Sequence, residues 1–145
     1  MNDAESNPPP KSFLWISSLA LIWNLIGLAS YVARVTMSPD ALAALPEAQR
    51  GLYENVPAWA TSAYAIATTA GVVGSLLLLL KRAWAVPVFI ISLLAVLAQM
   101  YHAFGMTNAY EVLGPSSVYL PAAIVVIAVA LIGYAGSAKR KGWIT

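Results

Sequence analysis

The 145-residue sequence has no cysteine, a single histidine, and few charged residues, with Asp, Glu, Lys and Arg making up 10% of the chain. The missing cysteines exclude disulfides, thiol redox chemistry and iron–sulfur clusters. A dihaem site needs axial ligands on facing helices, which His102 alone does not supply. A zinc site needs at least three protein ligands, and the one conceivable set (Glu54, Glu111 and His102) matches no metal motif. We expect no enzyme, no cofactor and no metal site.

Charged residues are also absent from four long stretches, residues 13–33, 57–80, 83–110 and 112–138. Each stretch is long enough to span a membrane, because a helix needs about 20 apolar residues to cross the hydrocarbon core of a bilayer. Barrel strands alternate apolar and polar residues, whereas Leu76–Leu80 is uniformly apolar. The sequence therefore predicts an all-α integral membrane protein with spans at about residues 13–34, 57–80, 84–104 and 117–137.

The few basic residues predict the orientation of these spans, because cytoplasmic loops of membrane proteins are enriched in Lys and Arg. Six basic residues fall on one side of the predicted spans: Lys11, Lys81, Arg82, Lys139, Arg140 and Lys141. The other side has Arg34 and Arg50, together with Asp40, Glu47, Glu54 and Glu111. We expect an up-down-up-down four-helix bundle with both termini in the cytoplasm.

Both ends of the chain are expected to be cytoplasmic tails. Residues 1–12 read as a disordered tail and residues 139–145 as a basic one. The first span is expected to stay in the mature protein, because its apolar run exceeds the 7–15 residues of a signal peptide.

The segment between the first two spans is the only long loop. Ser38-Pro39-Asp40 is typical of a helix start, with a capping hydroxyl, a proline at the first helical position and an acid in the first turn. We expect one or two short amphipathic helices on the outer membrane surface. An ordinary connecting loop is the alternative. Asn55-Val56-Pro57 has a similar capping pattern before the second span.

Small residues recur every four positions along the second span, at Ala63, Ala67, Gly71 and Ser75. Helices in lipid associate through close packing, and small residues let their backbones approach. The stripe predicts that this helix lies at the centre of the bundle or at a dimer interface.

Few polar side chains fall within the spans, and these are the candidate ligand-lining residues. They are Asn24, Tyr64, Thr68, Gln99 and His102. Gln99 and His102 share a helix face and would form the mouth of an outward-facing pocket with Tyr64 and Tyr119. In the alternative interpretation, Asn24 only bonds the second helix and His102 is an ordinary interfacial residue. No carboxylate or lysine lies within a span, which argues against ion coupling.

Several segments resemble a family of small bacterial four-helix inner-membrane proteins that often carry the label "sugar transporter". The resemblance rests on Val56–Thr61, Gly71–Pro87 and Ser92–Met100, with Asn24 in addition. It implies a bacterial inner-membrane protein and, through the label, transport of a sugar-like solute.

Three functions follow as hypotheses. The first is an oligomeric facilitator of a small uncharged solute, and the second is a non-catalytic accessory or assembly subunit of a larger membrane complex. The third, an enzyme or cofactor carrier, lacks the residues it needs. The expected partners are the lipid bilayer and a second copy or another membrane protein. Nucleic acid is not expected, because the Lys139–Lys141 cluster fits a topology signal near anionic lipid.

Overall fold

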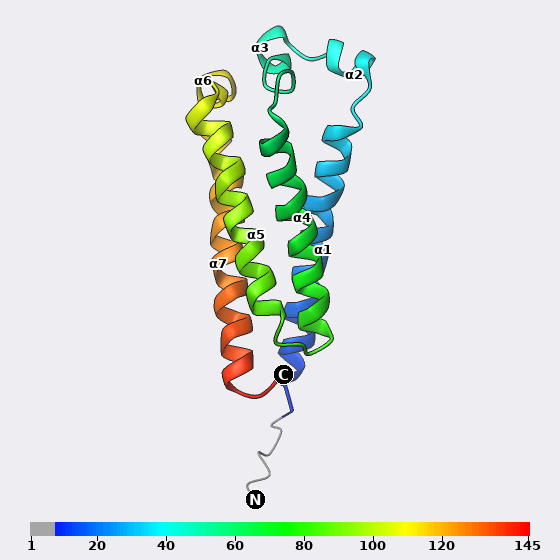
Figure 1. The fold of residues 1–145 in the computed structure, drawn as a ribbon, viewed down its shortest axis with the longest axis vertical. Coiled ribbons are helices and arrows are strands. Elements are labelled where there is room, and N and C mark those ends of the chain that lie inside the picture. Colours follow the sequence, from blue (N-terminus) through cyan, green and yellow to red (C-terminus); the bar gives the residue numbers. More distant parts are fainter. Residues whose placement is uncertain (1–7) are drawn as a thin grey trace, which may run out of the picture.

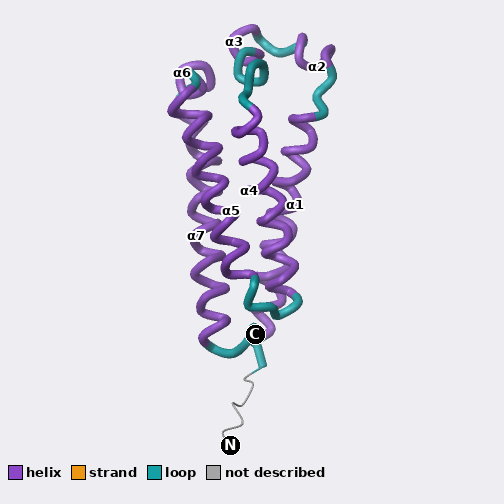
Figure 2. Tube along the Cα trace, in the orientation of Figure 1, coloured by secondary structure: helices purple, strands orange, loops and turns teal. Residues whose placement is uncertain are grey.

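The computed structural model describes residues 8–145, and its regular elements within that range are all helical (Figures 1 and 2). In chain order they are α1 (Lys11–Val35), α2 (Pro39–Ala43), α3 (Glu47–Arg50), α4 (Ala58–Leu79), α5 (Ala85–Met100), the π-helix η1 (Tyr101–Met106), α6 (Ala109–Leu113), the 3-10 turn η2 (Pro115–Val118) and α7 (Tyr119–Arg140).

Four helical segments of the described chain are long and apolar enough to cross a membrane. They are Lys11–Val35, Ala58–Leu79, Ala85–Met106 and Pro115–Arg140. They agree with the four predicted spans, and the third continues from α5 into the π-helix. The four lie side by side in Figure 1. The chain is thus built as a multi-pass membrane protein.

The helix ends differ from the prediction in two places. Helix α1 begins at Lys11, directly after Pro10, so the predicted disordered tail is too long by two residues; its residues 1–7 lie outside the described chain. Helix α7 continues to Arg140, with Lys139 and Arg140 in its last turn. Basic side chains there interact favourably with the negative end of the helix dipole, which accounts for the extension.

The last three residues fold back against the body of the protein, and we call residues 143–145 the C-terminal clasp. The backbone N–H of Thr145 donates to the carbonyl of Lys81 at 3.0 Å, and the N–H of Ala83 donates to the carbonyl of Thr145 at 2.9 Å. Ile144 is only 1% exposed. The last three residues of the predicted basic tail are therefore packed against the rest of the protein.

Helix α4 holds one of the two inner positions of the bundle, which agrees with the prediction from its small residues. It packs against α1 on one side and α5 on the other, and α7 packs chiefly on α5. All four stripe residues, Ala63, Ala67, Gly71 and Ser75, are buried. The stripe is therefore covered within one chain, and the alternative that it forms a dimer interface is wrong for this face.

The long loop contains two short helices, α2 and α3, as predicted. The hydroxyl of Ser38 accepts a hydrogen bond from the N–H of Ala41 at 3.1 Å, which confirms the predicted cap. The second predicted cap is absent. Asn55 has a φ of +59°, a left-handed conformation that asparagine tolerates better than most residues, and α4 begins after Pro57 without a side-chain cap.

Candidate functional site

A cavity of about 220 Å³ lies among the four long helices, and we call it the inner cavity. Three helices contribute polar side chains to its lining: Asn24 and Ser30 of α1, Tyr64 and Thr68 of α4, and Ser92 and Gln99 of α5. Helix α7 contributes an apolar wall that includes Ile124, Ile127 and Leu131.

A wider cavity of about 970 Å³ lies at the end of the molecule that carries α2, α3 and α6, and we call it the vestibule. The same five residues line the vestibule and the inner cavity: Tyr64, Gln99, Met100, Leu120 and Ile124. The two spaces therefore adjoin at the level of Tyr64 and Gln99.

All five predicted lining residues face this connected space. Asn24 and Thr68 line the inner cavity, His102 lines the vestibule, and Tyr64 and Gln99 line both. His102 lies in the π-helix Tyr101–Met106, a kind of segment that is frequent at functional sites. Tyr119 is the exception among the expected mouth residues, because it lines neither cavity and is 73% exposed.

Asn24 forms the interhelical bond that one of the two interpretations predicted. Its Nδ2 donates to the hydroxyl of Ser75 on α4 at 3.1 Å and to the carbonyl of Ala20 at 2.8 Å. Both amide hydrogens are therefore engaged within the protein. Asn24 lines the cavity and at the same time holds α1 to α4.

Two hydroxyls of the inner cavity are also engaged. Thr68 Oγ1 donates to the carbonyl of Tyr64 at 3.0 Å, within α4. Ser92 Oγ of α5 donates to the carbonyl of Ala67 at 2.7 Å, which joins α5 to α4. Because these hydroxyls already donate to the backbone, they offer a ligand only acceptor capacity.

Gln99, Tyr64 and His102 are different, because no side-chain hydrogen bond within residues 8–145 engages any of them. Aromatic edge-to-face contacts orient two of them. The rings of Tyr31 and Tyr64 are 5.3 Å apart, and those of Trp59 and His102 are 5.5 Å apart. Free side-chain donors and acceptors are thus present at the junction and in the vestibule.

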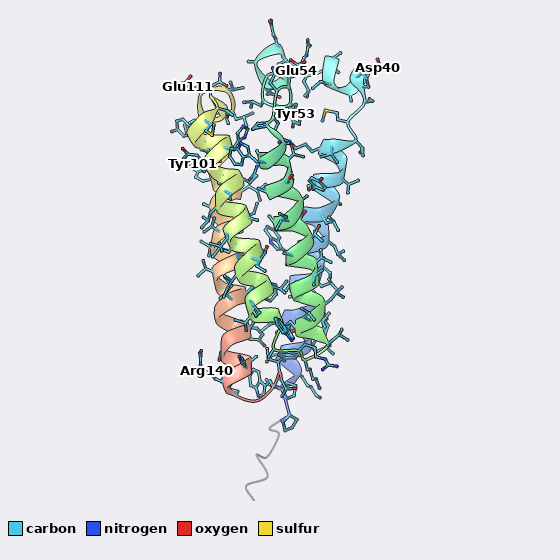
Figure 3. The ribbon with its side chains drawn as sticks, in the orientation of Figure 1. Asp40, Tyr53, Glu54, Tyr101, Glu111 and Arg140 are labelled. Carbon is cyan, nitrogen blue, oxygen red and sulfur yellow. The ribbon has the colours of Figure 1, made fainter. Side chains whose placement is uncertain are left out.

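Arg34 is the one charged side chain among the described residues that line the two cavities. Its Nη2 donates to the carbonyl of Leu52 at 3.0 Å, and its guanidinium lies 4.5 Å from the centre of the Tyr53 ring. Arg34 therefore ties the α3–α4 loop to α1. Glu54 and Glu111 lie at the same end of the molecule (Figure 3), and no group of metal-binding side chains is found in the described chain.

The opposite end of the inner cavity is closed. Phe13 of α1 stacks on Tyr134 of α7 with ring centroids 6.2 Å apart, and its edge-to-face contact with Trp143 has a centroid distance of 6.1 Å. Leu131 belongs both to the cavity wall and to the buried cluster that contains Phe13 and Ile144. This cluster and the C-terminal clasp form the floor of the cavity.

The apolar wall on α7 is the part of the site that the sequence prediction missed. The predicted lining residues include none of its apolar side chains, and Val126 and Val129 on the same helix are exposed. Ile124, Ile127 and Leu131 recur at a spacing of three and four residues, which places them on one helix face. That spacing was the available signal, but it is weak in a helix whose other faces are equally apolar.

No model of a known protein family, no curated protein and no solved structure matches this chain. The resemblance to small bacterial inner-membrane proteins and the sugar-transporter label therefore remain predictions.

Proposed function

We propose that this chain is a facilitator for a small uncharged solute, which it binds inside the membrane and passes without ion coupling. The observation that carries this proposal is the pair of adjoining cavities, whose free hydrogen-bonding groups, Tyr64 and Gln99, lie where the two spaces meet. Ligand sites are typically concave and mostly apolar, with a few well-placed polar groups.

The proposal includes no ion coupling because few ionisable side chains line the two cavities. No Asp, Glu, Lys or His within residues 8–145 lines the inner cavity, and the guanidinium of Arg34 in the vestibule donates a hydrogen bond to the loop. Proton relays and ion-coupled sites rely on ionisable groups within the membrane. Dipoles such as amides and hydroxyls suit an uncharged ligand.

We propose an up-down-up-down bundle in a bacterial inner membrane with both termini in the cytoplasm. Lys81 and the C-terminal clasp are hydrogen bonded to each other, which supports a common side for the basic Lys81-Arg82 turn and the Lys139–Lys141 cluster. Asp40, Glu54 and Glu111 lie at the other end, while Arg140 lies at the clasp end (Figure 3). The positive-inside rule then orients the vestibule outward.

An oligomer, or another membrane protein as partner, belongs to this proposal. Four helices line an inner cavity of about 220 Å³, and buried side chains form its floor. One copy has no open path through this floor, so the proposal includes a neighbour with which such a path is completed.

Uptake into proteoliposomes of the pure protein tests the facilitator proposal. The panel runs from glycerol and xylose to an aryl glucoside, each radiolabelled and compared with empty vesicles. We expect faster uptake of at least one solute, unaffected by an imposed pH gradient or membrane potential. The cavity-filling variant Ile127→Trp should abolish the increase, whereas Val126→Trp, on the exposed face of the same helix, should not. Equal uptake in empty vesicles across the whole panel contradicts the proposal.

The closed floor favours a second candidate, a non-catalytic accessory or assembly subunit of a membrane complex. Such a subunit needs no open path. Native-mass analysis of the tagged protein after gentle membrane extraction separates the two proposals. A stoichiometric larger partner, together with a failed uptake assay, supports the subunit.

A further inference from the structure

The inner cavity and the vestibule differ in the chemistry that they offer to a ligand. In the inner cavity, away from Tyr64 and Gln99, the amide hydrogens of Asn24 and the hydroxyl hydrogens of Ser30, Thr68 and Ser92 already bond the protein, and the indole N–H of Trp23 is the one side-chain donor of the described lining left without such a bond. Its remaining walls are largely aliphatic and aromatic, with Phe89 and Ile127 as examples. A hydroxyl group that entered this space would lose its bonds to water without gaining enough new ones.

The vestibule has the opposite character. Thr61, His102 and Asn55 line it with polar atoms that no side-chain hydrogen bond within the described chain occupies. Its volume of about 970 Å³ is more than four times that of the inner cavity. A hydroxylated group can be accommodated here with partners on the protein and access to water.

Tyr64 and Gln99 line both spaces, so a single molecule that reaches from one to the other passes between them. An amide and a phenol at this position can bond the linking atoms of such a molecule, because both groups donate and accept. The volume of the inner cavity limits the size of the part of the ligand that lies inside it. A dry cavity of about 150 Å³ holds a benzene ring, so about 220 Å³ admits one ring with little to spare.

We infer that the ligand is an uncharged amphiphile, with a hydroxylated head in the vestibule and a short apolar arm, about one ring in size, in the inner cavity. This inference rests on the proposed function and narrows its substrate class. The one cation among the described residues that line the vestibule, Arg34, already donates one N–H to Leu52 and lies over the Tyr53 ring, and a probe with an anionic head tests its remaining donors. A cationic head has no carboxylate among the described residues that line either space.

Equilibrium binding to the full-length protein in lipid nanodiscs tests the inference, with empty nanodiscs subtracted. The matched probes are phenyl β-D-glucoside, glucose (head alone), phenol (arm alone) and phenyl β-D-glucuronide (the same arm with a charged head). We expect phenyl glucoside to bind at least tenfold more tightly than any other probe. If glucose binds as tightly as phenyl glucoside, the ligand needs no apolar arm. If phenol does, it needs no hydroxylated head. If the glucuronide does, the head need not be uncharged, and each of these results overturns the inference.

Two pairs of variants locate the site. Ile127→Trp should abolish phenyl glucoside binding, and Val126→Trp should leave it unchanged. Gln99→Leu should weaken binding about tenfold, whereas Gln49→Leu, outside both cavities, should not change it. Loss of binding in all four variants, or in none, overturns the assignment. Binding is independent of transport, so phenyl glucoside that binds but does not cross proteoliposomes leaves this inference standing while the facilitator fails.

Discussion

Asn24 and Gly71 fit together across the interface between α1 and α4. A Cβ atom built at Gly71 would lie 2.9 Å from Cγ of Asn24 and closer still to its side-chain oxygen. The Asn24 amide occupies this space because its nitrogen bonds Ser75, one turn further along α4. The absence of a side chain at Gly71 therefore lets the polar contact of the α1–α4 interface form.

Replacing this glycine should destabilise the protein. In Gly71→Ala the new methyl group meets an amide held by two hydrogen bonds, so Asn24 must leave its rotamer or α1 must shift. Overpacking of this kind typically costs about 1–3 kcal/mol. Thermal unfolding followed by circular dichroism in lauryldimethylamine oxide micelles should show a lower Tm than the unmodified protein.

Gly133→Ala is the matched control, because a Cβ at Gly133 has no neighbouring atom within 4 Å. Its effect should be neutral or stabilising by up to about 1 kcal/mol, through lower backbone entropy in the unfolded chain. The double variant Asn24→Ala/Gly71→Ala should recover part of the loss. Equal Tm values for the two single glycine variants contradict the packing account.

The Asn24–Ser75 hydrogen bond itself should contribute little energy. Interhelical side-chain bonds in membranes average about 0.6 kcal/mol in double-mutant cycles, and Ser75 keeps its own bond to the carbonyl of Gly71. The cycle of Asn24→Ala, Ser75→Ala and the double variant should therefore show a coupling of about 0.6 kcal/mol. Strictly additive losses of stability would falsify the direct bond between the two side chains.

The predictable parts of the fold are those that the lipid environment determines. Four charge-free stretches predicted the four long helices, because a charged side chain in lipid is costly. The small-residue stripe predicted an inner position for α4, which lies between α1 and α5, and Asn24 bonds a neighbour because an amide in lipid finds a partner. These features depend on the residue type at a position, with little influence from the rest of the chain.

The parts that were not predictable depend on tertiary contacts. The clasp is held by backbone hydrogen bonds of Thr145 with Lys81 and Ala83, which leave no pattern in the sequence. The wall on α7 is one face of a helix that is apolar on every side. Tyr119 was assigned to the mouth from its depth alone, yet depth does not fix the rotation of a helix, and this residue is exposed.

The clasp should contribute measurably to stability. Ile144 is almost completely buried against the cluster around Phe13, and truncating a buried isoleucine to alanine typically costs about 2–5 kcal/mol. Ile144→Ala should therefore lower the Tm clearly in the same unfolding assay. Ile91→Ala, at a half-exposed position on α5, should cost about 0.5 kcal/mol or less. If both variants unfold at the same temperature, the clasp is not docked in solution.

Arg34 should control the mobility of the loop at the vestibule. Replacing it with methionine removes the hydrogen bond to Leu52 and the contact with the Tyr53 ring, while much of the aliphatic bulk remains. We expect several-fold faster chymotrypsin cleavage after Tyr53 in Arg34→Met, measured in nanodiscs by mass spectrometry. Arg82→Met, an exposed position in the turn at the other end, should leave the rate unchanged. An unaltered rate in Arg34→Met shows that the loop is held by other contacts.

The proposed orientation predicts which ends of the helices reach each aqueous compartment. Because the chain has no cysteine, single cysteines give labelling without background. Cysteines at Glu54 and Glu111 should react with a membrane-impermeant maleimide on intact cells, since both sites lie at the vestibule end (Figure 3). Cysteines at Lys81 and Lys141 should react only after the membrane is opened. If Lys81 and Lys141 label from opposite sides, then the clasp, the basic-residue argument and the outward-facing vestibule all fail together, because each requires those two positions to share a compartment.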